Sequence, residues 1–340
     1  MKTKLIIAAI LCIAAILLGV AIGSANIPIT DVINIIGYNI FGQSLPEHIV
    51  PGRVAIVWSN RMPRTLLAFI AGASLSVSGA VMQSVLRNPL ASSYTLGVSS
   101  GASFGASLVI FLGVTLPFMP MFTLPILGFT FGLTTILIVM AIARQLDVSM
   151  DNHTIILTGM VFSLFINAVT TMMFALFREG AQRMIFWQMG SFSMRGSWNT
   201  VYILAPIALV GILIISRFKW ELDIMTFGEE QAQTIGVNTG KVKLFLLITA
   251  AALTGSTIAF VGVIGFVDLV APHIVRKIFG SAHKYVIPMS AIVGGTFMVL
   301  ADIAARTLTS PVELPVGAVT AILGAPFFAY IYFGKRRRRA

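Results

Sequence analysis

Charged residues are scarce in this chain. They make up 10% of its 340 residues, whereas about 25% is usual in soluble domains. Cysteine occurs once, at Cys12, and this excludes an internal disulfide. The four histidines, His48, His153, His273 and His283, are scattered and form no metal-ligand motif. A disulfide scaffold and a recognisable zinc site are therefore both excluded.

Apolar residues are what the chain has instead, at 57% of its length. This composition predicts an all-α polytopic membrane protein, with residues 1–340 forming a single transmembrane domain. The formal net charge of +11 does not indicate nucleic-acid binding, because the basic residues lie between apolar runs and form no soluble patch.

Runs of about 20 apolar residues, long enough to cross a bilayer as helices, recur along the sequence. About ten transmembrane helices are expected, at roughly 5–23, 63–84, 95–113, 121–143, 154–177, 200–218, 242–263, 265–280, 285–305 and 315–333. A signal peptide is the alternative for the first run, but its length favours an uncleaved span. The eighth run is short and is interrupted by Pro272, as is typical of segments that line a pathway or pack inside protein.

Basic residues indicate the orientation of these spans. Sixteen of the 23 lysines and arginines fall on the side that holds both termini, and this bias predicts that both termini are cytoplasmic. The tail Lys335–Arg339 needs no role beyond anchoring to anionic membrane lipid.

Small residues recur along the stretch from residue 61 to residue 105. Gly72, Ser76, Gly79 and Gln83 share one helical face, and Gly97, Gly101 and Gly105 recur at every fourth position. Such spacing lets helices approach closely in lipid, so close helix packing is expected for most of these glycines. Between the two helices lies the loop Arg87-Asn88-Pro89-Leu90, where proline favours a turn or a constriction.

Two polar stretches are expected outside the membrane. Within residues 26–60, an interfacial helix is indicated by Ile29, Val32, Ile33, Ile36 and Ile40, which fall on one face. Residues 178–199 include an apolar piece that is too short to span and is expected at the outer interface.

Motifs for catalysis are missing from the sequence. The segment from Gly236 to Val242 resembles a phosphate loop, but it has one residue too few between its glycines and lacks the serine or threonine that would bind magnesium. Paired carboxylates, a nucleophile elbow and a zinc pattern are also missing, so an enzyme activity within this chain is not expected.

Three features are candidates for function. The charged inner segment Glu221–Gly236 contains two short helical pieces, and it is either a compact knob that docks into a partner or a solvated loop. At the outer side, Arg61, Arg64 and Arg306 are either snorkelling residues or a ring that meets acidic residues of a partner. Asp302 stands one turn before Arg306, a spacing that permits an ion pair. Asp268 lies in the short apolar eighth segment, where it is a coupling-ion site, a buried acid satisfied by a partner, or an acid near the outer surface.

Several motifs in order resemble one family. They are Arg61-Met-Pro-Arg64, the glycine-rich span ending in Gln83, Asn88-Pro-Leu-Ala91, Leu96-Gly97, Gly228-Glu229 through Gly236, Gly262-Val-Ile-Gly-Phe266 with Pro272-His273, Ala301-Asp302 with Arg306, and Glu313-Leu-Pro315-Val-Gly317. Over nearly its whole length the chain resembles the permease subunits of iron-siderophore, haem and cobalamin importers (type II ABC importers, FecCD- and BtuC-like).

The resemblance implies roles for particular residues. The coupling segment, about residues 219–241, would contact the ATPase subunit through Gly228, Glu229, Glu230, Ala232, Ile235 and Gly236. Arg61, Arg64 and Arg306 would contact an extracytoplasmic substrate-binding lipoprotein. Asn88, Leu90 and Gln83 would lie near the inner gate, and the fifth span would line the path of a dimer formed with a second copy or a sibling permease. Family members generally have glycine where this chain has Asp268.

The function expected from the resemblance is that of a permease subunit in the cytoplasmic membrane of a bacterium, for ferric siderophores, with haem and cobalamin as alternative substrates. Such a chain binds no cofactor itself, since ATP and magnesium are bound by the partner ATPase, and it binds no nucleic acid. The alternative class is an ion-coupled secondary transporter in which Asp268 is the coupling acid.

Overall fold

The computed structural model describes residues 2–23, 25, 27–193 and 195–337, with side chains described up to residue 329. The basic tail expected to anchor the chain to lipid, Lys335–Arg339, therefore lies outside the residues whose side chains are described.

Helices account for all ten of the expected spans. They are α1 (Lys2–Ala21), α4 (Met62–Val85), α5 (Val98–Leu112), α6 (Thr123–Leu146), α7 (Asn152–Leu176), α9 (Trp198–Arg217), α12 (Thr239–Val261), α13 (Val267–Phe279), α14 (His283–Thr307) and α15 (Val316–Arg337). Within the described residues, seven helical stretches are long and apolar enough to cross a membrane. The predicted all-helical membrane fold is confirmed.

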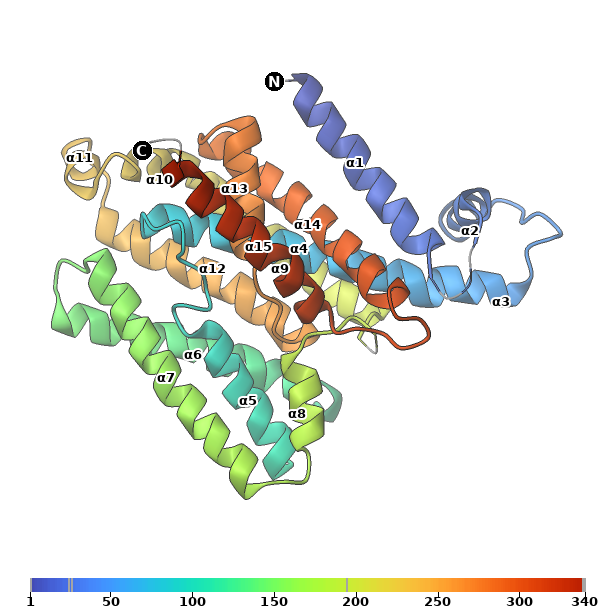
Figure 1. The fold of residues 1–340 in the computed structure, drawn as a ribbon, viewed down its shortest axis with the longest axis horizontal. Helices are drawn as coiled ribbons and strands as arrows, with labels where there is room; N and C mark the ends of the chain where they lie inside the picture. The colour runs from blue at the N-terminus through green and yellow to red at the C-terminus, as the bar shows by residue number, and fades with distance from the viewer. Residues whose placement is uncertain (1, 24, 26, 194, 338–340) are drawn as a thin grey trace.

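Helix α4 runs through the middle of the bundle, with α12, α13 and α14 packed against it (Figure 1). In the most apolar 18 residues of the stretch Pro51–Val85, 83% of the residues are buried. The corresponding share is 22% in α1 and in α7. The central position of α4 follows from its small side chains, because they leave room for neighbouring backbones on several sides.

Glycines on α4 and α5 make the closest helix contacts. A Cβ atom added to Gly72 would lie 2.2 Å from the carbonyl oxygen of Gly294 on α14, and one added to Gly79 would lie 2.0 Å from that of Asp268 on α13. On α5, Gly101 and Gly105 approach the backbone of α6 in the same way. The predicted close packing of these glycines is confirmed.

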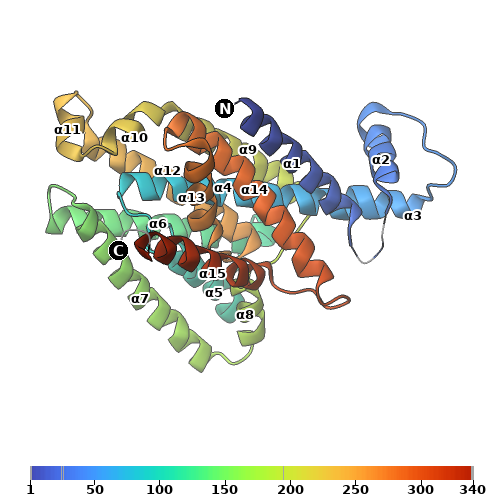
Figure 2. The same cartoon turned by 45° about the horizontal axis from the view of Figure 1, so that its top comes forward.

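The outer polar stretch forms an appendage that projects beyond α1 and α14 (Figure 2). It consists of α2 (Ile29–Phe41), α3 (Pro51–Val54) and a π-helical segment, η1 (Ala55–Arg61), that continues into α4. Asp31 of α2 accepts hydrogen bonds from Arg53, at 2.5 Å, and from His48, at 3.1 Å. These bonds fix α2 against the start of α3.

The buried face of α2 differs from the expected isoleucine stripe. Val32 and Ile35 are fully buried, whereas Ile29, Ile33 and Ile40 are exposed. Ile35, which is absent from the predicted stripe, therefore takes part in the packing, and most of the stripe faces away from the protein. An apolar face left in this position suits contact with the lipid interface.

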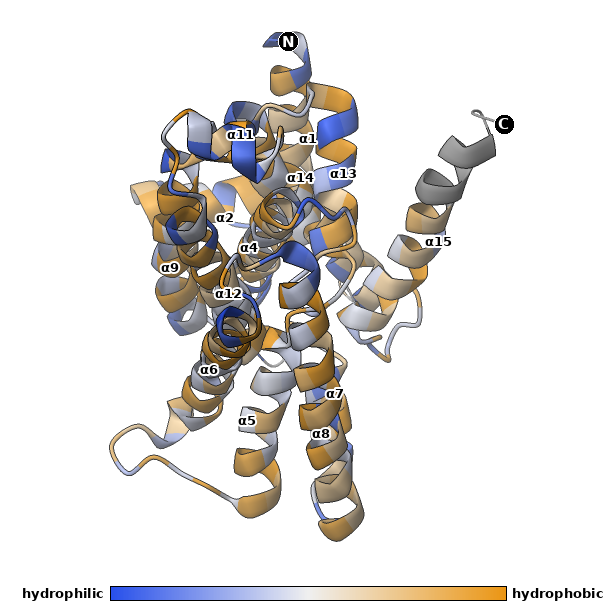
Figure 3. Cartoon of the chain, turned by 90° about the vertical axis from the view of Figure 1, so that its left-hand side faces the viewer, coloured by the Kyte–Doolittle hydropathy of each residue, from blue (hydrophilic) through white to orange (hydrophobic). Residues whose placement is uncertain are grey.

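The remaining short helices lie at opposite ends of the bundle. On the expected outer side, α8 (Ala181–Gln188) is too short to span, as predicted. At the other end, α10 (Lys219–Met225) and α11 (Glu229–Thr234) form a polar protrusion. Figure 3 shows hydrophilic residues about α11 and hydrophobic residues along α6 and α7. The start of α1 lies toward the α11 end, and α15 runs back toward the same end (Figure 3).

We expect Gly79→Ala to destabilise the protein by about 1–3 kcal/mol, the usual cost of forcing extra atoms into a packed interface. The added methyl group would collide with the backbone of Asp268, which cannot move without shifting α13. Thermal unfolding in detergent measures the effect.

Gly240→Ala is the matched control, because a Cβ atom there meets nothing within 4 Å. Helix propensity alone would make either substitution mildly stabilising. Equal melting temperatures for the two variants would contradict the backbone contact.

Candidate functional site

The first candidate site is the protrusion formed by α10 and α11, called here the inner knob (residues 219–236). Leu222, Met225 and Ala232 are buried and hold it against the bundle. Its tip exposes apolar side chains, with Phe227 77% and Ile235 67% exposed. Two large apolar side chains are thus exposed on a protrusion that is otherwise largely polar.

Glycines shape the inner knob at both ends of α11. Gly228 has φ of 134° and Gly236 has φ of 94°, a region that residues with side chains seldom adopt. Gly228 is buried and Gly236 is exposed. Both predicted glycines therefore set the course of the backbone, and their substitution would alter the position of α11.

Glu229, which is partly exposed, pairs with a buried lysine on α12. The Nζ atom of Lys243, whose side chain is fully buried, lies 2.6 Å from Glu229 Oε1. It also donates to the carbonyl oxygen of Met150, at 2.8 Å, and to Asn152 Oδ1, at 2.9 Å, in the segment that joins α6 to α7. Glu229 thus positions α11, whereas Glu230 is exposed at the surface of the knob.

The three residues predicted near an inner gate differ in their surroundings. Gln83 is buried, donates to the carbonyl oxygen of Asp268 at 3.2 Å and accepts a hydrogen bond from Arg276. Asn88 Oδ1 accepts a hydrogen bond from the backbone N–H of Leu90, at 2.9 Å, and so stabilises the turn around Pro89. Of the three residues, only Leu90 is exposed, so Gln83 joins helices while Leu90 faces out of the protein.

The second candidate site is the outer arginine cluster, composed of Arg61, Arg64, Arg306, Asp302 and Glu313. Arg64 pairs with Asp302, at 2.8 Å, and with Glu313, at 2.9 Å. Arg306 lies 3.5 Å from Asp302, so the ion pair predicted from their spacing is confirmed. Three cations against two carboxylates leave the cluster with one net positive charge.

The arginines of this cluster also stabilise the end of α1. Arg61 donates to the carbonyl oxygens of Val20, at 3.2 Å, Ala21, at 2.7 Å, and Ala25, at 2.5 Å. Arg306 donates to the carbonyl oxygen of Gly19. Helix ends have carbonyl groups without intrahelical partners, and these two buried side chains supply the missing donors.

Glu313 is the most accessible carboxylate of the outer cluster, with its side chain 37% exposed. Burial raises the pKa of Glu313, but the hydrogen bonds and charge of Arg64 lower it by more, so the pKa stays below its usual value. The carboxylate is therefore ionised at neutral pH and occupies Nη1 of Arg64.

Asp268 is 2% exposed, and no side chain among the described residues makes a hydrogen bond to its carboxylate, which faces the backbone N–H groups of Asp268 and Leu269. It lies in the first turn of α13, against the backbone contact with Gly79. Groups of three or more histidine, cysteine, aspartate or glutamate side chains that could hold a metal ion are not found in the part of the chain that the structure describes.

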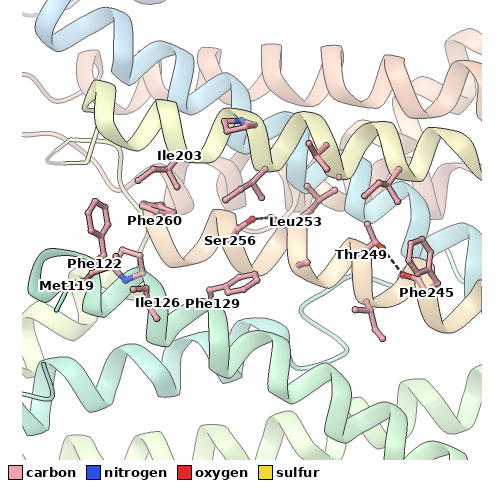
Figure 4. Close-up of a pocket in the computed structure, with 18 residues that line it drawn as sticks. Met119, Phe122, Ile126, Phe129, Ile203, Phe245, Thr249, Leu253, Ser256 and Phe260 are labelled. Atoms are coloured by element: carbon pink, nitrogen blue, oxygen red, sulfur yellow. Dashed lines mark hydrogen bonds between the residues drawn. The ribbon is translucent and has the colours of Figure 1, made fainter. Parts of the chain in front are cut away.

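A groove of about 900 Å³ lies between α6, α9 and α12. Figure 4 shows aromatic and aliphatic side chains along it, from Phe122 and Phe260 at one end to Phe245 at the other. Its two labelled hydroxyl groups are already satisfied, since Thr249 donates to Phe245 and Ser256 donates to Leu253 within α12. The groove therefore offers an apolar surface and no free polar group from these two residues.

A bundle of apolar helices, with a polar knob at one end and a charged cluster at the other, defines a multi-pass membrane protein. The model of the FecCD transport family matches residues 11–334, and the chain belongs to this family. It is thus the non-catalytic permease subunit of an ABC importer of the cytoplasmic membrane. Membership implies partnership with an ATPase and a binding protein, and it decides against the ion-coupled secondary transporter. Permease subunits of this kind typically bind no cofactor.

Individual relatives and one solved structure agree with this assignment. The chain is 42% identical, over 95% of its length and 91% of the relative's, to YvrB, an uncharacterized ABC transporter permease protein of Bacillus subtilis. It is 36% identical over 84% of both chains to YfmE, an Fe(3+)-citrate import permease of the same species. BtuC, a cobalamin import permease of Halobacterium salinarum, is 37% identical over 81% of this chain and 73% of its own. An inward-facing metal-chelate type ABC transporter superposes with a TM-score of 0.85 at 27% identity, covering 98% of this chain and all of the other.

The sequence alone did not reveal several polar residues of the site. Lys243, Arg276, Ser84, Asp223 and His283 were not singled out as site residues. Lysine in an apolar helix is an available signal, because a charge there requires a partner. The pairing of Asp223 with His283, 60 positions apart, leaves no local pattern.

We expect Lys243→Met to release α11 from the bundle. Amide hydrogen exchange across residues 226–236 should rise by about tenfold or more, because each hydrogen bond to a charged group contributes roughly 1.5 kcal/mol or more. Hydrogen exchange with mass spectrometry measures this directly.

Lys241→Met is the control, since Lys241 is exposed and lies on the same helix two residues earlier. Unchanged exchange in the Lys243 variant would show that Glu229 does not hold α11.

Proposed function

We propose that the chain is the permease of a ferric-siderophore importer that receives its substrate from an extracytoplasmic binding lipoprotein and is driven by a separate ATPase. The observation that carries the substrate is the 36% identity to an Fe(3+)-citrate import permease. Haem remains an alternative substrate because the family includes haem importers. Cobalamin remains one because the chain is 37% identical to a cobalamin import permease.

The inner knob is proposed as the ATPase contact. In support, Phe227, Glu230 and Ile235 are exposed at its tip, while Glu229 and Ala232 hold it in place. On this proposal Gly228 and Gly236 act by shaping the backbone. An apolar tip surrounded by polar residues is the surface that a cleft in a partner recognises.

A second permease copy, or a sibling, is proposed to pack beside α7 around a central path. The support is the row of exposed apolar side chains on α7, which includes Leu157, Val161, Leu164 and Phe165. An intermolecular disulfide between copies that carry Leu164→Cys would detect this arrangement. The groove between α6, α9 and α12 is proposed instead to contact membrane lipid, since its lining is apolar.

The transport cycle is proposed to alternate access to this path. ATP binding in the partner moves the inner knob, and the turn containing Asn88 and Leu90, together with Gln83, lies where the inner end of the path would open or close. Because substrate must leave at the inner side, the path should hold it weakly.

Uptake by cells that lack this gene tests the function. With iron-55 supplied on several siderophores and on citrate, and with labelled haem and cobalamin, we expect loss of ferric-siderophore uptake and its recovery when the gene is returned. Removal of the ATPase partner should abolish the same uptake, whereas a protonophore should leave ATP-driven uptake intact while ATP is maintained.

Loss for haem or cobalamin alone would replace the proposed substrate and keep the importer mechanism. Uptake that stops with the protonophore but survives without the ATPase would contradict the importer reading.

The outer arginine cluster is proposed as the contact for the binding protein, and Arg64 is its most testable member. The carboxylate of Glu313 accepts a hydrogen bond from Nη1 of Arg64, so this donor is not available to an acidic residue of the binding protein. Glu313→Gln weakens that ion pair, and we expect it to tighten docking by about two- to fivefold, the range of exposed ion pairs. The affinity of the binding protein for the permease in nanodiscs measures the change.

Glu179→Gln is the control, because it removes an exposed acid on the same side but outside the cluster. Equal affinities for the wild type and both variants at low salt would show that Arg64 does not contact the binding protein. The two variants also distinguish the possible roles of Arg64. If Arg64 only pairs internally with Asp302 and Glu313, neither variant should change the affinity of the binding protein.

A further inference from the structure

A continuous chain of polar side chains connects the inner knob to the centre of the bundle. It is called here the inner relay and consists of Asp223, His283, Ser84, Arg276 and Gln83. Asp223 belongs to α10, His283 starts α14, Ser84 and Gln83 lie near the end of α4, and Arg276 lies on α13. Four helices therefore meet in one set of hydrogen bonds.

Distances along the relay are those of direct hydrogen bonds. Asp223 Oδ1 lies 2.6 Å from His283 Nδ1 and also accepts from the backbone N–H of His283, at 2.8 Å. His283 Nε2 lies 2.7 Å from the Ser84 hydroxyl. Arg276 Nη2 donates to Ser84 at 3.1 Å, and Nη1 donates to the side-chain oxygen of Gln83.

The Ser84 hydroxyl has one proton and two acceptors within reach, His283 Nε2 at 2.7 Å and the carbonyl oxygen of Ala80 at 2.9 Å. If neutral His283 donates its Nδ1 proton to Asp223, then Nε2 accepts the hydroxyl proton of Ser84, and the Ser84 oxygen accepts from Arg276. The bonds from Arg276 through Ser84 and His283 to Asp223 then run in one direction, and aligned bonds polarise and strengthen one another, while Arg276 donates separately to Gln83.

Burial makes the relay sensitive to displacement. Gln83, Ser84 and His283 are all buried. Moving one member away leaves buried donors or acceptors without partners, which is unfavourable in a low-dielectric interior. The members are thus expected to move together.

The far end of the relay acts on α13. Gln83 donates to the backbone carbonyl of Asp268 at 3.2 Å, beside the contact between Gly79 and the same backbone. Helix α13 is bounded by two positions of positive φ, Phe266 at 70° and Gly280 at 91°. Such positions mark changes in chain direction on either side of a short helix.

We propose that the inner relay transmits displacement of the inner knob to α13 and α4, with Ser84 and His283 as its positioning residues. This inference rests on the proposed contact between the inner knob and the ATPase. Through the relay, a displacement of the inner knob at the ATPase contact would reach α4 and α13, although the exposed face of the knob does not touch these helices.

The experiment uses the permease assembled with its ATPase in nanodiscs, with and without magnesium and the ATP analogue AMP-PNP, followed by hydrogen exchange. In the wild type, the nucleotide should change exchange in α11 and in α13. In Ser84→Ala, the change at α11 should persist, while the change at α13 should fall at least about fivefold, the lower end of ordinary coupling between sites.

Matched variants separate a relay from a static link. Ser76→Ala removes a buried hydroxyl of the same helix that has no hydrogen-bond partner among the described residues, and it should behave as the wild type. Ser84→Thr keeps the hydroxyl and should restore the response of α13. If Ser84→Ala does not assemble, Asp223→Asn weakens the same chain from its more exposed end and should give the same pattern.

The possible failures are distinguishable. If the nucleotide leaves α11 unchanged in the wild type, the ATPase contact is wrong and the relay falls with it. If α11 responds and the response of α13 is equal in the wild type and Ser84→Ala, the contact stands and the relay is overturned.

Discussion

Contact between helix backbones along α4 is the constraint on which the rest of the structure depends. Helices surrounded by lipid gain little from burying apolar side chains, so their association relies on close packing. Gly72 and Gly79 bring the backbones of α14 and α13 against α4. This closeness leaves no space for larger side chains, and it also fixes where polar groups on three helices can meet.

Polar groups are concentrated at the two ends of this packed centre. At the outer end, Arg61 and Arg306 supply donors to the last carbonyl groups of α1. At the inner end, Lys243 and the inner relay hold the loops that follow α9 and precede α12 and α14. In both places a buried charge is matched by several partners, as an interior with little water requires. Asp268 is the exception between them, because no side chain among the described residues makes a hydrogen bond to its carboxylate.

Much of the fold could be predicted because hydrophobic length and small-residue spacing are local properties. They locate the spans, the backbone contacts of Gly72 and Gly79, and the pair formed by Asp302 and Arg306 one helical turn apart. The candidate site was less accessible to prediction. The ion pair of Glu229 with Lys243 and the hydrogen bond of Gln83 with Arg276 could not be predicted from the sequence. Such pairs depend on tertiary packing, which spacing along one helix does not encode.

The unbroken helical stretch from Pro51 to Val85 has a mechanical consequence. Its 35 residues measure roughly 50 Å at 1.5 Å per residue, whereas the hydrocarbon layer of a bilayer is about 30 Å thick. The stretch is therefore longer than the hydrocarbon layer, and α2 packs against it near its outer end (Figure 1). A small tilt of α4 about its packed centre would swing this outer end through a larger arc. If the relay proposed above moves the inner end of α4, the outer appendage would be displaced as well, because both belong to the same continuous helical stretch.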